Sequence, residues 1–174
     1  QDNFYSLADG KLKMKLLPEI MDSLVSPSMI IRRITHHDFF MQAKMEFTAK
    51  SQNEVAGVTI YRASTNYYQM VKTQNTVKLI RRQGKNIEVI AEMPYTKSDV
   101  VFSIKAVDGK MNFMFGDKEW SKEMLAEGIS LEAISDENTF GFTGPFIGMY
   151  ASSQGSISQN EALFDWFDYE DLKK

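Results

Sequence analysis

The sequence predicts an all-β protein in which two antiparallel sheets stack as a sandwich. Roughly twelve short segments alternate apolar and polar residues or read as buried strands, and turn-forming residues separate them. No stretch shows a convincing amphipathic helix. The 174 residues fit one domain, and 43% hydrophobic with 25% charged residues is an ordinary balance for a folded globular protein.

The first strands are expected after an approach segment, Gln1–Asp9. Lysines alternate with apolar residues over Lys11–Leu17, which favours an edge strand because lysines discourage an edge from pairing with another molecule. The two prolines of Pro18–Ser28 predict a loop, and Met29–Ile34 reads as a short strand.

The clearest alternation follows, over Phe39–Phe47. One side of this strand is wholly apolar and is expected to face the core, comprising Phe39, Met41, Ala43, Met45 and Phe47. Gly57 lies inside the next strand, where it indicates a bulge or a close approach of another backbone. The strands expected after Phe47 are Val55–Arg62, Tyr67–Lys72, Val77–Arg82 and Asn86–Glu92.

A hairpin is predicted by the Asp108-Gly109 pair, which joins Asp99–Ala106 to Met111–Phe115. Beyond it, Ser121–Leu131 is expected to hold a helical turn at most. The remaining segments are a turn at Gly116–Lys118, an extended pair at Glu119–Trp120, and two strands, Pro145–Ala151 and Leu163–Tyr169, on either side of a polar loop, Ser152–Asn160.

Charge and composition exclude several function classes. Net charge is −3 and basic residues form no long run, so no nucleic-acid partner is expected. Cysteine is absent, which removes disulfides and thiol chemistry. No apolar run approaches the roughly 20 residues of a membrane helix. Because the chain opens with Gln1, we expect an upstream part to be missing, and a signal peptide there would imply a periplasmic or secreted protein.

A family resemblance appears near the C-terminus. The phrase GFTGPFIGMYA, followed by FDWFDY, resembles the end of the concanavalin A-like β-sandwich that closes β-xylosidases and α-L-arabinofuranosidases of glycoside hydrolase family 43. The resemblance runs from about Leu12 to Tyr169 and includes the twin Arg32-Arg33 strand. It implies a concanavalin A-like, jelly-roll antiparallel sandwich. A shortened turn before Trp120 departs from the family pattern and weakens any transfer of exact specificity.

The resemblance also implies a non-catalytic accessory domain. In the resembled enzymes the catalytic carboxylates belong to an upstream five-bladed propeller, so the expected partners are that propeller and an oligosaccharide derived from xylan or arabinan. A loop of the sandwich there brings a phenylalanine to the mouth of the active site. Phe142 and Phe146 match that loop and are our candidate substrate-rim residues, with simple core packing as the alternative.

No catalytic set is expected within the chain itself. Glycoside hydrolysis needs two facing carboxyl groups, and the Glu-x-Asp-x-x-Glu strand of catalytic concanavalin A-like sandwiches is absent. The nearest carboxylate cluster is Asp165, Asp168, Glu170 and Asp171, at the chain end. His36 and His37 are neighbours and would point to opposite faces of a strand, so surface or loop positions are expected for them.

A structural calcium ion is a further expectation. Sandwiches of this type often hold one where the last strand meets the N-terminal segment, and Asp165 is the candidate ligand. The alternative is that Asp165 accepts backbone hydrogen bonds at a strand edge. For the whole chain, two other functions stay open: a freestanding carbohydrate-binding lectin, and an independent glycanase of laminarinase type, which the missing carboxylate strand disfavours.

Overall fold

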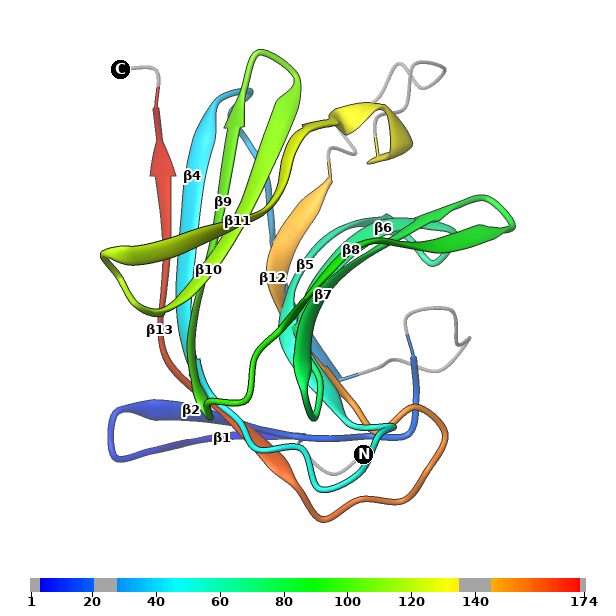
Figure 1. The fold of residues 1–174 in the computed structure, drawn as a ribbon, viewed down its shortest axis with the longest axis vertical. Coiled ribbons are helices and arrows are strands. Elements are labelled where there is room, and N and C mark those ends of the chain that lie inside the picture. The colour runs from blue at the N-terminus through cyan, green and yellow to red at the C-terminus, as the bar shows by residue number, and fades with distance from the viewer. Residues whose placement is uncertain (1–3, 21–27, 135–144, 173–174) are drawn as a thin grey trace.

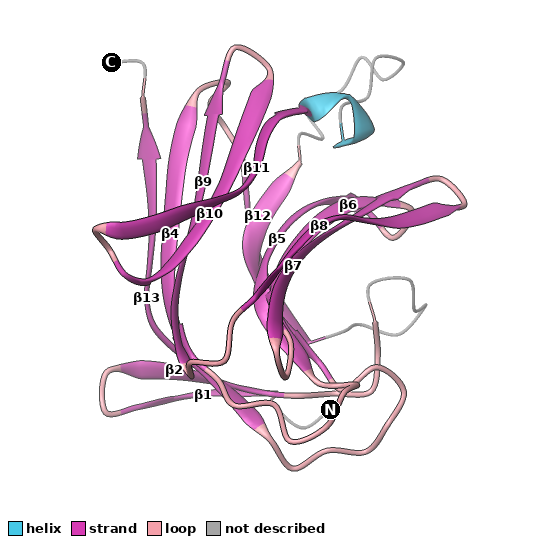
Figure 2. Ribbon diagram, in the orientation of Figure 1, coloured by secondary structure: helices cyan, strands magenta, loops and turns pink. Residues whose placement is uncertain are grey.

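The computed structural model describes residues 4–20, 28–134 and 145–172, and most of this described chain is extended strand (Figures 1 and 2). All neighbouring strands within each sheet pair antiparallel. The seven-stranded sheet has the order β1 (Tyr5–Ala8), β2 (Lys11–Lys15), β13 (Glu161–Asp171), β4 (Phe39–Glu46), β9 (Asp99–Val107), β10 (Lys110–Lys118) and β11 (Ser121–Ser130).

The second sheet has six strands, in the order β3 (Ser28–Arg33), β12 (Phe146–Ser152), β5 (Val55–Ala63), β6 (Asn66–Lys72), β7 (Thr76–Gln83) and β8 (Asn86–Pro94). A single turn of 3-10 helix, η1 (Leu131–Ile134), follows β11, and Ile134 is fully buried in the core. The predicted antiparallel β-sandwich is therefore confirmed. Among the described residues, no helix has the length and hydrophobicity needed to cross a membrane.

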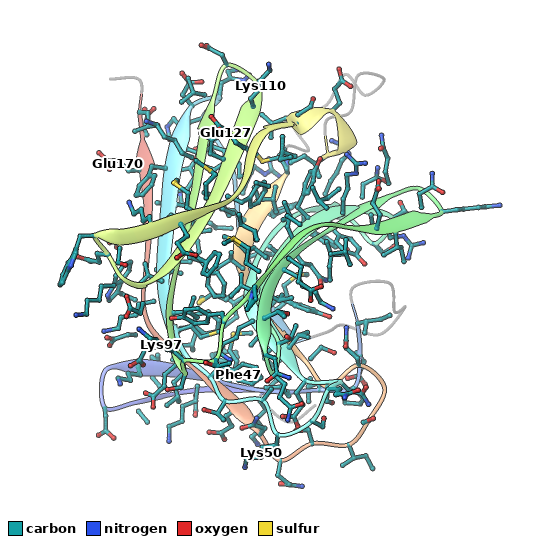
Figure 3. All side chains as sticks on the ribbon, in the orientation of Figure 1. Phe47, Lys50, Lys97, Lys110, Glu127 and Glu170 are labelled. Atoms are coloured by element: carbon teal, nitrogen blue, oxygen red, sulfur yellow. The ribbon has the colours of Figure 1, made fainter. Side chains whose placement is uncertain are left out.

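The core lies between the two sheets, where side chains fill the space (Figure 3). All five residues predicted for the inner side of the strand Phe39–Phe47 belong to the core, although β4 itself ends at Glu46, and each is at most 1% exposed: Phe39, Met41, Ala43, Met45 and Phe47. Burial of such side chains stabilises the fold by about 25 cal/mol for each Å² of apolar surface removed from water. The period-two pattern thus located the centre of the core correctly.

Two predictions at the N-terminus were wrong. The approach segment contains a strand, β1, whose residues pair with β2 from Tyr5 opposite Met14 to Ala8 opposite Lys11. As a result β2 is not an edge strand, because β13 pairs with its other side. The lysines of β2 still point away from the core, since Met14 and Leu16 are buried.

The strand β11 was also missed, since a helical turn at most was expected there. Its pairing with β10 shifts register at three places, and Gly128 has a positive φ of 67°. Each irregularity displaces the alternation of side chains, so the period-two signal of a strand is lost from the sequence. The preceding turn lies at Glu119 and Trp120, which were expected to be extended.

Lys72 is a buried cation in this core. It ends β6 opposite Ala56 and Val77, which are both core residues, and the whole residue is only 2% exposed. Its Nζ donates a hydrogen bond to the carbonyl oxygen of Thr73 at 3.0 Å. Burial lowers the pKa of Lys72 below its usual 10.5, because a charged amine is poorly solvated there.

We therefore expect Lys72→Met to raise the free energy of unfolding at pH 7 by about 1 kcal/mol. The advantage of the variant should shrink as pH rises towards 10.5, because the folded pKa lies below the unfolded one and the buried amine loses its charge first. Urea unfolding at pH 7 and pH 10 measures both effects. Lys105→Met, at an exposed lysine of β9, is the control and should stay within about 0.5 kcal/mol at both pH values. A stability difference for Lys72→Met that does not change with pH would contradict this account.

Candidate functional site

Phe146 is the first residue of β12, and its neighbours fix the side of the sheet on which it lies. It stands opposite Arg33 of β3 and Tyr61 of β5. The next residue, Ile147, is fully buried between the sheets. Since successive side chains alternate, Phe146 lies on the outer face of the six-stranded sheet, the face turned away from the seven-stranded sheet. The other rim candidate, Phe142, lies outside the described residues.

Aromatic and arginine side chains lie at the same level as Phe146 on the neighbouring strands, so that they form a row across the sheet. The register places Tyr67 of β6 next to Tyr61, and Arg82 of β7 next to Tyr67. The Arg33 guanidinium lies 5.8 Å from the centre of the Phe146 ring, and the rings of Tyr61 and Tyr67 stack with centres 6.5 Å apart. We call this set the outer row; its members are Arg33, Phe146, Tyr61, Tyr67 and Arg82.

A second apolar cluster lies on the same outer face, next to this row. We call its buried members the outer cluster: Val55, Tyr67, Val71, Ile80 and Tyr150. Met29 and Tyr61 are partly buried and pack against this cluster. In Figure 1, strands β5 to β8 curve so that the hollow side of the sheet faces away from the seven-stranded sheet. Thr59 lies on the same outer face, and its hydroxyl donates a hydrogen bond to the carbonyl oxygen of Tyr68 at 2.9 Å.

The chemistry of the outer row favours packing rather than proton transfer. Its five residues are three aromatics and two arginines, and none carries a carboxyl group. Arginine over an aromatic ring provides cation–π attraction and a flat apolar surface. Hydrolysis of a glycosidic bond instead requires two carboxyl groups at a defined separation. The row is therefore suited to contact another molecule and not to cleave one.

The histidines do not form a shared site. Nδ1 of His36 lies 3.2 Å from the hydroxyl oxygen of Tyr169, and its Nε2 lies 3.4 Å from a carboxylate oxygen of Asp171. These contacts join the segment after β3 to the end of β13. His37 is exposed and takes no part in them. The expectation of surface or loop positions for both histidines agrees with this arrangement.

Asp165, the candidate calcium ligand, lies beside a lysine, and the calcium ion stays a prediction. Asp165 is exposed on β13, and its carboxylate lies 3.9 Å from Nζ of Lys44. A hollow of about 250 Å³ beside it is also lined by Lys11, Glu46 and Asp99, and Lys11 pairs with Glu46 at 3.7 Å. The amines of Lys44 and Lys11 are therefore the cations next to the carboxylates of Asp165 and Glu46. Within the described ranges, no three His, Cys, Asp or Glu side chains come together in a way that could hold a metal ion.

Comparison with known families decides what kind of sandwich this is. The family model described as the β-xylosidase C-terminal concanavalin A-like domain matches residues 1–170. The chain belongs to this family. The resemblance noted in the sequence is thereby confirmed, and so is the concanavalin A-like fold.

The relatives of this chain are longer proteins. A non-reducing end α-L-arabinofuranosidase of Bacteroides ovatus is 34% identical over 178 residues, which cover 98% of this chain but 33% of the relative. A xylosidase/arabinosidase of Butyrivibrio fibrisolvens is 29% identical over 177 residues, covering 98% and 34%. The chain therefore spans about a third of the length of the curated relatives it matches.

Solved structures agree with this assignment. GH43B of the Bacteroides ovatus xyloglucan PUL superposes with a TM-score of 0.87 at 29% identity, covering 97% of this chain and 34% of that one. A xylan β-1,4-xylosidase of Bacillus halodurans has a TM-score of 0.86 at 22% identity, covering 97% and 34%, which is evidence for the fold alone. A protein of Saccharomyces cerevisiae has a TM-score of 0.67 at 10% identity, and the match covers 92% of that chain.

Sequence reasoning found Phe146 but missed the rest of the outer row. The missed residues are Arg33, Tyr61, Tyr67 and Arg82. A signal was present, since the segments that form β5 and β6 carry uncharged residues at every second position on the side away from the core. A strand that is solvated on one face instead alternates apolar residues with charged or polar ones.

Proposed function

We propose that this domain is the accessory part of a longer glycosidase, where it packs against the catalytic domain and shapes one rim of the substrate pocket. The observation that carries the proposal is the family match over residues 1–170, together with coverage of only 33% and 34% of the curated relatives. The names of those relatives favour oligosaccharides derived from xylan or arabinan as the substrate of the complete enzyme.

Phe146 and Phe142 are the residues proposed for the rim. Support for Phe146 comes from its position at one end of β12, half-buried on the outer face. Arg33 lies against its ring, which limits the orientations that the ring adopts. An aromatic face held in this way can stack on a sugar ring, which gains from apolar contact with the carbon–hydrogen face of the sugar. Phe142 is proposed by its place in the same sequence phrase.

Substitution in the complete enzyme tests the rim. We expect Phe146→Ala to raise KM for a xylo-oligosaccharide about fivefold to tenfold, which corresponds to a loss of about 1 kcal/mol of binding. Steady-state kinetics with a short and a longer substrate measures this change, and Phe142→Ala is measured in parallel.

The matched control is Phe40→Ala. Phe40 is half-buried on the outer side of β4, and Nζ of Lys122 lies 4.7 Å from its ring, so the same kind of cation–aromatic contact is removed from the opposite sheet. Its kinetics should equal those of the parent enzyme. If both rim variants keep the parental kinetics while remaining folded, the rim role is wrong.

The isolated chain is expected to release no reducing sugar from xylan or arabinan oligosaccharides. Activity of the isolated chain would instead support the independent glycanase. Titration calorimetry separates the lectin alternative, because a freestanding lectin would bind an oligosaccharide at millimolar concentration or below. Binding of that strength by the chain alone would contradict the accessory role.

A further inference from the structure

The two sheets of the sandwich differ sharply on their outer faces. In the seven-stranded sheet, the outer face of the central strands β13, β4 and β9 carries six charged residues among apolar and neutral polar ones such as Phe40, Val101 and Ser103. The charged residues on that outer face are Lys44, Glu46, Asp99, Lys105, Asp168 and Glu170. Charged residues at this density are typical of a sheet face that lies largely in water.

The central strands of the six-stranded sheet carry no charge on their outer face. The pairing of β12, β5 and β6 puts only neutral side chains there: Val55, Gly57, Thr59, Tyr61, Tyr67, Gln69, Val71, Phe146, Gly148, Tyr150 and Ser152. Three of these residues are tyrosines, and the outer cluster already forms an apolar centre among them. Most of these residues are already buried within this chain, and the aromatic side chains left partly accessible on these strands are Tyr61 and Phe146.

Exposed aliphatic side chains extend this neutral face to the edge of the sheet. Ile87 and Val89 of β8 are 55% and 52% exposed. They stand opposite Arg82 and Ile80 of β7, and Ile80 belongs to the outer cluster, so both lie on the outer face. Two neighbouring aliphatic residues that are half exposed on an edge strand indicate a contact surface rather than a solvated edge.

We infer that the accessible part of the outer face of the six-stranded sheet, from Phe146 and Tyr61 to Ile87 and Val89, is the surface on which this domain docks against the catalytic domain of the longer polypeptide. The inference rests on the proposed function and adds the location of the contact. The matching surface should be apolar where it meets these side chains and acidic beside them, because Arg33, Lys78 and Arg82 border the neutral face. Tyrosine and arginine around an apolar centre are typical of protein interfaces.

A protein partner fits this face better than a sugar does. Tyr67 and Tyr150 are 5% and 1% exposed, so the centre of the face is closed to any partner and only its accessible margin can make contact. The accessible apolar groups at the edge are Ile87 and Val89, and branched aliphatic side chains pack against protein more readily than against the hydroxylated faces of sugars. The relatives have about two-thirds of their length beyond the matched region, which supplies the partner within the same chain.

The test is a double substitution in the complete polypeptide, Ile87→Glu with Val89→Glu. Both side chains are half exposed, so this chain alone should keep its own stability when they change. In the complete polypeptide we expect the single thermal transition to split into two, and hydrogen exchange in β8 to speed up about tenfold or more. Calorimetry and exchange mass spectrometry measure these effects.

The control pair is Val107→Glu with Met124→Glu, on the outer side of the seven-stranded sheet. Val107 and Met124 are 38% and 42% exposed, so the number of apolar groups and charges changed is the same. This pair should leave the single transition intact. If the control pair splits the transition and the β8 pair does not, the docking face is wrong while the accessory role stands.

Other outcomes overturn the inference in distinguishable ways. Concentration-dependent dimers of this chain, abolished by the β8 pair, would assign the face to a second copy. Slower exchange of β8 on addition of xylohexaose to this chain would assign it to sugar. If the complete polypeptide never shows a coupled transition and its catalytic part is equally active alone, the accessory role itself fails.

Discussion

Gly148→Ala is expected to lower the free energy of unfolding by about 3 kcal/mol or more, because the position has no room for a single methyl group. A Cβ placed on Gly148 would lie 1.9 Å from the carbonyl oxygen of Ile30 and 2.7 Å from the Cα of Ile31. Both atoms belong to the backbone of β3, which pairs with β12 at this point. Relief would require the two strands to separate, and their ladder of hydrogen bonds would then be lost.

Gly57 of β5 lies equally close to the backbone of its paired strand, β6. Its Cβ would meet the carbonyl oxygen of Met70 at 2.1 Å, again in the backbone of a paired strand. Gly57→Ala should therefore cost a similar amount. Both glycines lie on the outer face of the six-stranded sheet. Guanidinium unfolding of each variant gives the change in free energy.

Gly84→Ala is the control, because it separates the clash from the general effect of replacing glycine. Gly84 lies in the turn between β7 and β8 with a φ of 65°, and a Cβ there would have no atom within 4 Å. The expected cost is only the strain of a positive φ, about 1 kcal/mol. Equal losses for Gly84→Ala and Gly148→Ala would show that close strand approach is not the cause.

The sequence predicted most of this architecture because its strands follow a regular period. The apolar side of β4 and the turn at Asp108 and Gly109 were both read correctly, and Gly57 was correctly associated with close backbone approach. Each of these signals is local, so neighbouring residues alone are enough to reveal it.

The failures have a different origin. The bulges of β11 hide its period, and β1 is too short, at four residues, to show one. The outer row brings together residues from five strands, from Arg33 to Phe146, and their neighbourhood depends on the order of strands in the sheet. Periodicity gives the side of each strand but not its neighbours, so this surface could not be assembled from the sequence.

The second large effect concerns Glu54, a buried carboxylate that joins two loops. It is 5% exposed and accepts hydrogen bonds from the backbone N–H of Lys50 at 2.8 Å, the side-chain amide of Asn160 at 2.7 Å and the hydroxyl of Ser158 at 2.6 Å. Lys50 lies between β4 and β5, whereas Ser158 and Asn160 lie between β12 and β13. Each loop connects one sheet to the other, so Glu54 fixes both crossings at the same end of the sandwich.

We expect Glu54→Ala to cost about 3 kcal/mol, since three donors lose their acceptor in a place with little access to water. Acid should have a related effect on the unsubstituted protein. Burial on its own would raise the pKa of Glu54, but the hydrogen bonds from Ser158, Lys50 and Asn160 outweigh it, and the net pKa lies below the usual 4.5. The stabilisation is therefore complete above pH 4.5 and is lost as the pH falls through the lower, folded value.

Glu54→Gln separates charge from shape. The amide keeps one acceptor oxygen, so this variant should lose less stability than Glu54→Ala at pH 7. The difference in free energy of unfolding between Glu54→Gln and the parent should narrow as the pH falls below 4.5, because only the parent loses its carboxylate charge. Glu46→Gln is the matched control, because Glu46 is half exposed and its ion pair with Lys11 is worth less than about 1 kcal/mol. Denaturant unfolding between pH 3 and pH 7 distinguishes the cases. If the parent and Glu54→Gln lose stability in parallel over that range, then the carboxylate of Glu54 does not link the two crossings.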